Sequence, residues 1–169
     1  KQAIEVMASK GIINGTSDTT FSPAAKIKRA DFILLLVKAL GLSGIADDNF
    51  ADVKSTAYYA EAVGIAKKLG IVEGKGGNIF EPEANITRQE MMALATRALS
   101  AAQIPLEQGS ADQLAGFDDI SKIAPYAVEG ISTLIKNGIV SGNGTSVNPR
   151  GNATRAEASV MIYKMYNLQ

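Results

Sequence analysis

The feature that most constrains the fold is a short motif that occurs three times along the 169 residues. A glycine-bounded segment reads GIING, GIVEG and GIVSG, and each copy is followed by a proline and then by an arginine at a nearly constant distance. The three arginines are Arg29, Arg88 and Arg155. Repetition of this kind is typical of chains that are built from copies of one supersecondary unit. The sequence therefore predicts three copies of one unit.

Each copy predicts two helices joined by a loop. The segment YYAEAVGIAKKLG has apolar residues at helical spacing and ends at Gly70, where a helix would finish in a left-handed glycine. A loop rich in Gly, Asn and Pro follows, and helical spacing then resumes at Met91, Leu94, Ala95, Ala98 and Leu99. We therefore expect an all-α fold of three helix-loop-helix repeats.

The repeats divide the chain into residues 1–46, 47–103 and 104–169. Because each helix pair has only one apolar face to bury, we expect the three repeats to share one core and to unfold as one cooperative unit. No segment like Phe50–Val53 or Phe117–Ile120 precedes the first repeat. This predicts that the first repeat is incomplete at its N-terminus and that the chain was cut from a longer protein.

Composition excludes several classes of function. The chain has no Cys and no His, so thiol nucleophiles, histidine bases and the usual ligands of zinc are absent, and we expect neither a metal nor a cofactor. Its 17 Lys and Arg balance its 17 Asp and Glu, which gives no net charge to attract nucleic acid. No apolar run is long enough to insert into a membrane.

The residues around the arginines predict helix starts that carry an unexpected charge. The expected structural caps are Thr87, Glu90, Thr154, Glu157 and Asp31. Each arginine then occupies the first helical position, where the helix dipole disfavours a cation by up to about 1 kcal/mol. The first repeat differs from the others because Lys28 stands where they have threonine.

Two interpretations of these arginines are open. An arginine beside the unpaired N–H groups of a helix start forms a site for a ligand carboxylate, and such a contact is worth about 1.5–3 kcal/mol. Alternatively, the arginines pair within the molecule, either with Asp52 or Asp119 or with the acidic residue of their own helix start, and so act as structural clamps.

In order along the chain, the motifs F-x-D-[VI], G-[IV]-[IV]-x-G, F-x-P and [IV]-T-R-x-E resemble three tandem S-layer homology modules. The resemblance implies a pseudo-threefold spindle whose second helices form a central three-helix bundle. It also implies a non-catalytic module of a longer surface protein, located outside the cell on the bacterial cell wall or S-layer. The implied partner is a secondary cell-wall polymer attached to peptidoglycan, with pyruvate ketals on N-acetylmannosamine, held in grooves between repeats.

The resemblance turns several residues into candidate ligand contacts. These are Arg29, Arg88, Arg155, Lys28, Asp52, Asp119, Gly15, Gly74 and Gly142. The glycines are also explained by loops with positive φ. Lys28 in place of threonine leaves two alternatives open: the first groove is weakened, or it is built with a second cation. Tyr58 and Tyr126 are either core or groove-wall aromatics or platforms on which a sugar stacks.

Two other functions compete with this interpretation. A helical-repeat scaffold for protein–protein interaction is the alternative, although the chain has no Trp and few aromatic residues outside the repeated positions. A glycoside hydrolase needs two carboxylates that face each other across a sugar, whereas the acidic residues here are dispersed in triplicate. The pattern favours repeated binding over a single catalytic centre.

Overall fold

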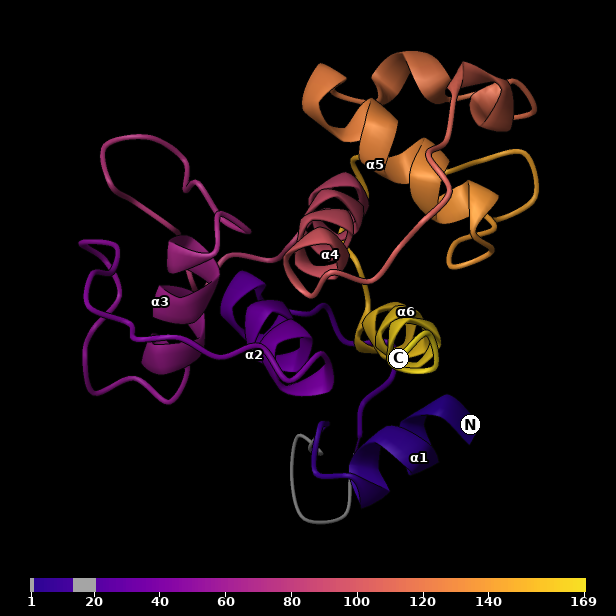
Figure 1. The fold of residues 1–169 in the computed structure, drawn as a ribbon. Helices are drawn as coiled ribbons and strands as arrows, with labels where there is room; N and C mark the ends of the chain where they lie inside the picture. The colour runs from indigo at the N-terminus through magenta and orange to yellow at the C-terminus, as the bar shows by residue number, and fades with distance from the viewer. Residues whose placement is uncertain (1, 14–20) are drawn as a thin grey trace.

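The computed structural model describes residues 2–13 and 21–169, and within them it is helical, with no strand (Figure 1). The helices are α1 (Gln2–Ser9), α2 (Arg29–Ala39), α3 (Ala60–Lys68), α4 (Arg88–Ala101), α5 (Pro125–Lys136) and α6 (Arg155–Tyr166), with short 3₁₀ helices η1 (Ala111–Leu114) and η2 (Ile120–Lys122). The predicted all-α class and the helix, loop, helix order are confirmed. No helix in the described part of the chain is long and apolar enough to cross a membrane.

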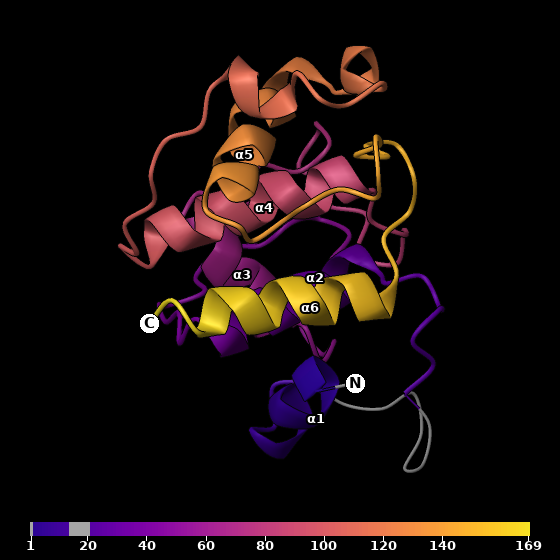
Figure 2. The ribbon, with the colours of Figure 1, turned by 90° about the vertical axis from the view of Figure 1, so that its right-hand side faces the viewer.

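The helices pair between repeats and not within them. The first helix of each repeat packs against the second helix of another repeat, so that α3 lies on α2, α5 on α4 and α1 on α6. Figures 1 and 2 show α1 beside α6 and α5 beside α4, at opposite ends of the molecule. In the middle, α2 packs against both α4 and α6. Because the first helix of the chain packs against the last one, the contacts between repeats form a closed cycle.

A ring of three backbone hydrogen bonds joins the starts of the second helices. Ile27 N–H donates to Ala153 O (3.1 Å), Ala153 N–H to Ile86 O (2.9 Å) and Ile86 N–H to Ile27 O (3.1 Å). Each of these buried residues lies two positions before its repeat's arginine, and antiparallel bridges between neighbouring loops flank the ring. Each repeat thus supplies one donor and one acceptor, so the ring requires all three.

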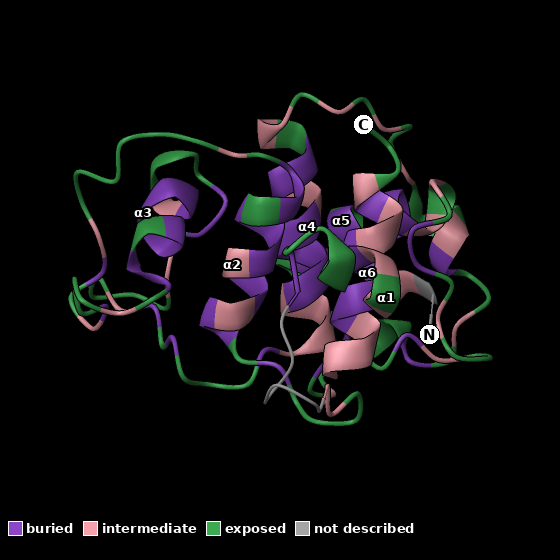
Figure 3. Ribbon diagram, turned by 90° about the horizontal axis from the view of Figure 1, so that it is seen from below, coloured by how far each residue is buried: buried purple, intermediate pink, exposed green. Residues whose placement is uncertain are grey.

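The hydrophobic core is continuous through the three repeats. Phe32 from the first repeat, Phe80 and Leu99 from the second and Ile131 from the third are fully buried members of one cluster. Figure 3 shows buried residues concentrated on the helices and exposed residues along the outer loops. This shared core supports the predicted cooperative unit, which remains a prediction.

Left-handed glycines end the first helices as the sequence predicts. Gly70 and Gly138 follow α3 and α5 with φ of 69° in both cases, and Gly11 has φ of 67° after α1. Each provides an N–H group that bonds back to a carbonyl of the last turn, which turns the chain into the following loop.

Candidate ligand-binding grooves

The predicted capping boxes are present at α4 and α6. The Thr87 hydroxyl accepts from Glu90 N–H at 3.4 Å, and the Glu90 carboxylate accepts from Thr87 N–H at 2.9 Å. Thr154 and Glu157 repeat this exchange at 3.2 and 2.7 Å. Both glutamates keep a second carboxylate oxygen for other partners.

The expected cap at Asp31 is wrong. Helix α2 has Lys28 as its N-cap and no side-chain capping bond, because a lysine side chain has no acceptor atom. The Asp31 carboxylate instead accepts a short hydrogen bond from the Tyr58 hydroxyl. Lys28 lies 2.5 Å from Glu83, in an exposed ion pair.

The backbone N–H groups at the helix starts are not open to a ligand, contrary to the sequence-based expectation. At the first helical position, the N–H groups of the three arginines donate to Ala84 O, Gly151 O and Ala25 O, at 2.8–2.9 Å. At the second position, the N–H groups donate to Pro82 O, Pro149 O and Pro23 O. The loop of another repeat supplies these acceptors in every case. A ligand carboxylate must therefore meet the arginine side chain and not the helix amides.

The arginine side chains clamp one repeat to another. Arg29, only 5% exposed, donates through Nε to Phe80 O at 2.9 Å and through Nη1 to Glu90 Oε1 at 3.2 Å. Arg88 likewise donates through Nε to Val147 O at 2.8 Å and through Nη1 to Glu157 Oε1 at 2.5 Å. The acidic partner is the capping glutamate of the next repeat. It is neither the arginine's own acidic residue nor Asp52 or Asp119, which the sequence had suggested.

Arg155 follows the same pattern in the last repeat. Its Nε donates to Phe21 O at 3.0 Å, and its guanidinium stacks on the Phe21 ring at 4.8 Å. Arg29 stacks equivalently on Phe80, at 4.9 Å. Phe21 and Phe80 begin the FSP and FEP motifs, and each is the platform for an arginine of another repeat, a function that the sequence did not show. The last repeat has Val147 at this position.

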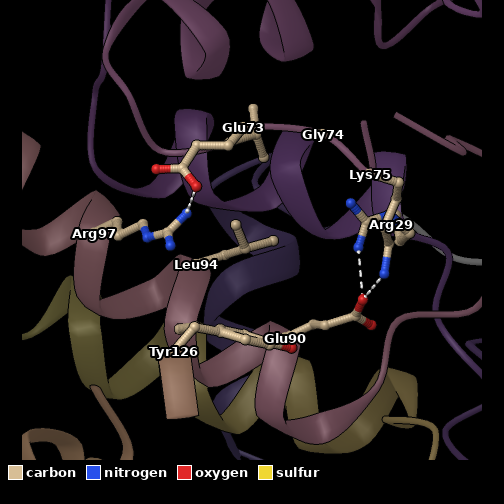
Figure 4. Close-up of a pocket in the computed structure, with 10 residues that line it drawn as sticks. Arg29, Glu73, Gly74, Lys75, Glu90, Leu94, Arg97 and Tyr126 are labelled. Atoms are coloured by element: carbon tan, nitrogen blue, oxygen red, sulfur yellow. Dashed lines mark hydrogen bonds and ion pairs between the residues drawn. The ribbon is translucent and has the colours of Figure 1, made fainter. Parts of the chain in front are cut away.

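One groove contains the Arg29 clamp. This Arg29 groove has a volume of about 260 Å³ and is lined by Arg29, Val72, Glu73, Gly74, Lys75, Glu90, Ala93, Leu94, Arg97 and Tyr126. Figure 4 shows Arg29 and Lys75 converging on Glu90, while Arg97 and Glu73 face each other on the opposite side, 3.8 Å apart. Its three cations exceed its two carboxylates.

A second groove repeats this site one repeat later. This Arg88 groove, of about 270 Å³, includes Arg88, Val140, Gly142, Glu157, Val160, Met161 and Lys164. Gly142 takes the place of Gly74, Glu157 that of Glu90 and Lys164 that of Arg97. Here two cations exceed one carboxylate. The repeated excess of positive charge suits an anionic ligand.

Each clamp leaves part of the guanidinium available. Within the described chain, Arg29 and Arg88 use Nε and Nη1 in the bonds given above, and neither has a protein partner at Nη2. No buried side-chain nitrogen or oxygen among the described residues lacks a hydrogen-bond partner, so Nη2 reaches the surface. The clamps therefore hold two arginines in place while leaving N–H donors for a ligand.

The clamp glutamates stay ionised in the folded protein. Burial alone would raise the pKa of Glu90, but hydrogen bonds from Lys75 and Thr87, together with the charge of Arg29, bring it below the ordinary value of 4.5. The pKa of Glu157 is lowered in the same way: Thr154 and Arg88 outweigh the effect of burial. Both grooves therefore keep their ion pairs at neutral pH.

We expect these pKa shifts to make stability depend on acid. Because the folded pKa values of Glu90 and Glu157 lie below 4.5, the stability they contribute is complete above about pH 4.5 and is lost as the pH falls through the folded values. Thermal unfolding at pH 7, 4.5 and 3 should show this decrease, and Glu90→Gln should show a smaller one. An equal decrease in the variant would contradict the assignment.

Asp52 and Asp119 hold loops and line neither groove. Asp52 accepts from the N–H groups of Phe80 and Glu81, at 2.9 and 2.7 Å. Asp119 accepts from Val147 N–H at 2.9 Å, Asn148 N–H at 2.8 Å and the Ser146 hydroxyl at 2.7 Å. These bonds fix the residue before each proline, which has a positive φ of 60° or 51°. The structure places both aspartates in this structural role and not where ligand contact was expected.

The predicted glycines line the grooves and also meet a steric demand. Gly74 and Gly142 have φ of 78° and 71°. A Cβ at Gly74 would lie 2.6 Å from Ile79 O, and one at Gly142 would lie 2.5 Å from the Phe117 ring. A side chain at either position would therefore clash with the protein itself, so both glycines have a structural reason that needs no ligand. Gly15 lies outside the described residues.

Comparison with known proteins identifies the family. The S-layer homology domain model matches residues 2–33, 49–92 and 116–159, one segment in each repeat. The chain belongs to the S-layer homology domain family. Membership makes it an anchoring module of the bacterial cell wall or S-layer.

S-layer homology relatives include both enzymes and surface-layer proteins. The chain is 37% identical to exoglucanase XynX of Acetivibrio thermocellus, 38% to an amylopullulanase of Thermoanaerobacterium thermosulfurigenes and 31% to a surface-layer 125 kDa protein of Lysinibacillus sphaericus. Each match covers 96% of this chain but only 15%, 9% and 14% of the respective relative. The chain thus spans about a tenth to a seventh of these relatives.

Sequence reasoning missed part of the S-layer homology grooves. Lys75 and Arg97 line the Arg29 groove, and Lys164 lines the Arg88 groove. One signal was available, because Lys38, Arg97 and Lys164 each stand nine positions after an arginine at a helix start. Lys75 has no such signal, since Asn143 takes its place in the last repeat.

Proposed function

We propose that this S-layer homology chain binds a pyruvylated secondary cell-wall polymer and so anchors a longer surface protein, either an S-layer subunit or an enzyme, to the cell wall. The proposed ligand unit is N-acetylmannosamine that carries a pyruvate ketal. The observation that carries the proposal is the recurrence of one cationic groove, with a fixed arginine, in successive repeats. The family and its surface-layer relatives support the location.

The Arg29 groove can bind a carboxylate without rearrangement of the Arg29 side chain. Arg29 is held by Phe80 and Glu90, so little side-chain entropy is lost when its free Nη2 binds a ligand. The Lys75 side chain is 40% exposed, so its ammonium can contact an incoming carboxylate beside Glu90. A charge-assisted contact of this kind contributes about 1.5–3 kcal/mol. We assign Arg29 and Lys75 as the carboxylate-binding pair of this groove.

The grooves differ in ways that predict unequal affinity. In the Arg88 groove, Asn143 stands where the Arg29 groove has Lys75, so one cation is missing beside the clamp. Val160 there is 46% exposed, whereas Ala93 is buried at the equivalent position. We therefore propose that the Arg29 groove binds the acidic sugar more tightly than the Arg88 groove does.

The pyruvate group should dominate affinity. Calorimetric titration with N-acetylmannosamine bearing a 4,6-linked pyruvate should give binding about 10- to 150-fold tighter than with the same sugar without pyruvate. Added salt should weaken binding only modestly, because a partly desolvated contact is screened less than an exposed pair. Equal affinity for the two sugars would contradict carboxylate recognition.

A matched pair of variants tests the groove. Lys75→Asn gives the Arg29 groove the residue of the Arg88 groove and should weaken binding of the pyruvylated sugar. Lys122→Asn makes the same change at an exposed lysine outside both grooves and should leave binding unchanged. Cosedimentation with cell-wall sacculi, before and after their secondary polymer is stripped, tests anchoring itself.

A further inference from the structure

A larger groove continues from the Arg29 groove. This linker groove, of about 470 Å³, lies between α4, α5 and the segment 104–108, and it includes Ser100, Ile104, Leu106, Gln108 and Glu129. It shares Ala93, Arg97 and Tyr126 with the Arg29 groove. A chain molecule bound in the first groove can therefore continue into the second past the exposed Tyr126 ring.

Tyr126 leaves this passage open, whereas its counterpart in the preceding repeat is tied down. The Tyr58 hydroxyl donates to Asp31, the residue at the third position of α2. Tyr126 faces Glu90 at the equivalent position, but Glu90 is already used by Arg29, Lys75 and Thr87. Tyr126 is 53% exposed, and its hydroxyl forms no hydrogen bond with any residue that the structure describes. Both its ring and its hydroxyl are therefore available to a ligand.

The linker groove differs from the Arg29 groove in charge and polarity. Its one cation, Arg97, is balanced by Glu129, whose carboxylate accepts from the Gln108 amide at 3.0 Å. Ile104 and Leu106 add an apolar wall. A few directed polar groups on an apolar surface are typical of sites for uncharged small ligands. An N-acetylhexosamine matches this wall: its acetamido methyl and ring faces suit apolar contact, and its amide and hydroxyl groups can hydrogen-bond.

We infer that the linker groove is a second sugar subsite, which binds an uncharged N-acetylhexosamine adjacent to the carboxylate-bearing sugar of the same polymer, with Tyr126 between the two. This inference rests on the proposed function. A ketal across O4 and O6 leaves the anomeric carbon and O3 of the acidic sugar for linkage, so the polymer can extend out of the Arg29 groove. The segment 104–108 then contributes to the choice of the neighbouring sugar.

Methyl-resolved NMR titration separates the two subsites. The probes are the pyruvylated monosaccharide and a disaccharide in which its anomeric carbon is linked to a neutral N-acetylhexosamine. The monosaccharide should shift the methyl signals of Val72 and Leu94, which line the Arg29 groove. The disaccharide should also shift those of Ile104 and Leu106, and it should bind about tenfold tighter.

A substitution that fills the linker groove provides the second test. Ser100→Trp should remove the advantage of the disaccharide and leave the monosaccharide affinity unchanged. Ser55→Trp, at an exposed loop serine that lines neither groove, is the control and should keep the advantage. An advantage that survives in Ser100→Trp, or unshifted Ile104 and Leu106 signals while the monosaccharide binds, overturns the subsite alone. Failure of both sugars to shift Val72 and Leu94 overturns the proposed function and the subsite with it.

Discussion

Arg29→Ala is expected to lower the free energy of unfolding by about 2–4 kcal/mol. The substitution removes a buried guanidinium that donates to Phe80 O and to Glu90 and stacks on the Phe80 ring. The Glu90 side chain is only 13% exposed, and after the substitution Lys75 is the one cation of the clamp that still contacts it. From the sequence alone, loss of a cation at the first helical position should cost nothing. The stability lost with the inter-repeat clamp exceeds the stability gained by removing a cation from the helix start, so the expected sign is reversed.

Denaturant unfolding should be measured for Arg29→Ala and for the control variant Arg150→Ala, so that the loss of the buried clamp is compared with the loss of a surface arginine. Arg150 is exposed and forms one hydrogen bond, of 3.2 Å, to Lys122 O. Its removal should change stability by less than about 1 kcal/mol. Equal stability of the two variants would show that the Arg29 clamp contributes no more than a surface arginine does.

Separating the last repeat from the first two should abolish cooperative folding of both parts. Fragment 1–103 would retain α4 without α5, and α1 without α6, so two helix pairs would expose the faces that they bury against each other. Fragment 104–169 would lose the same contacts. The three-membered hydrogen-bond ring would also open, because Ala153 both donates to it and accepts from it.

Calorimetry can measure this loss on each fragment and on an equimolar mixture. We expect no sharp transition from either fragment alone and recovery of one transition in the mixture, since the missing faces then become available in trans. A sharp transition from either fragment alone, or separate transitions for residues 1–46 and the remainder, would contradict a single cooperative unit.

Much of the local structure could be predicted because neighbouring residues determine it. Thr87 and Glu90 lie three positions apart, so their capping box forms within one helical turn wherever that helix packs. Gly70 ends a helix through its own positive φ, which needs no distant partner. Repetition of these signals also established the helix, loop, helix order and the three repeats.

The same local logic failed where Lys28 replaced threonine. Asp31 has the spacing of a capping residue, but no acceptor stands at the N-cap, and the carboxylate turns to Tyr58 instead. Tyr58 belongs to the next repeat, 27 positions along the chain from Asp31. No periodic pattern in the sequence identifies a partner at that distance.

The sequence by itself determined the helical class, the repeats, the capped starts of α4 and α6, and the arginine at the start of each second helix. Only the tertiary structure decided that α1 packs on α6, that loop carbonyls of another repeat take the helix N–H groups, and that Arg29 clamps Glu90 of the next repeat. The physical reason is that every buried N–H donor needs a hydrogen-bond acceptor. Residue spacing in the sequence predicts that acceptor only when it lies a few residues away. For Arg29 and Arg88, closure of the three repeats brings the acceptor from more than 50 positions away, and the same closure forms the grooves.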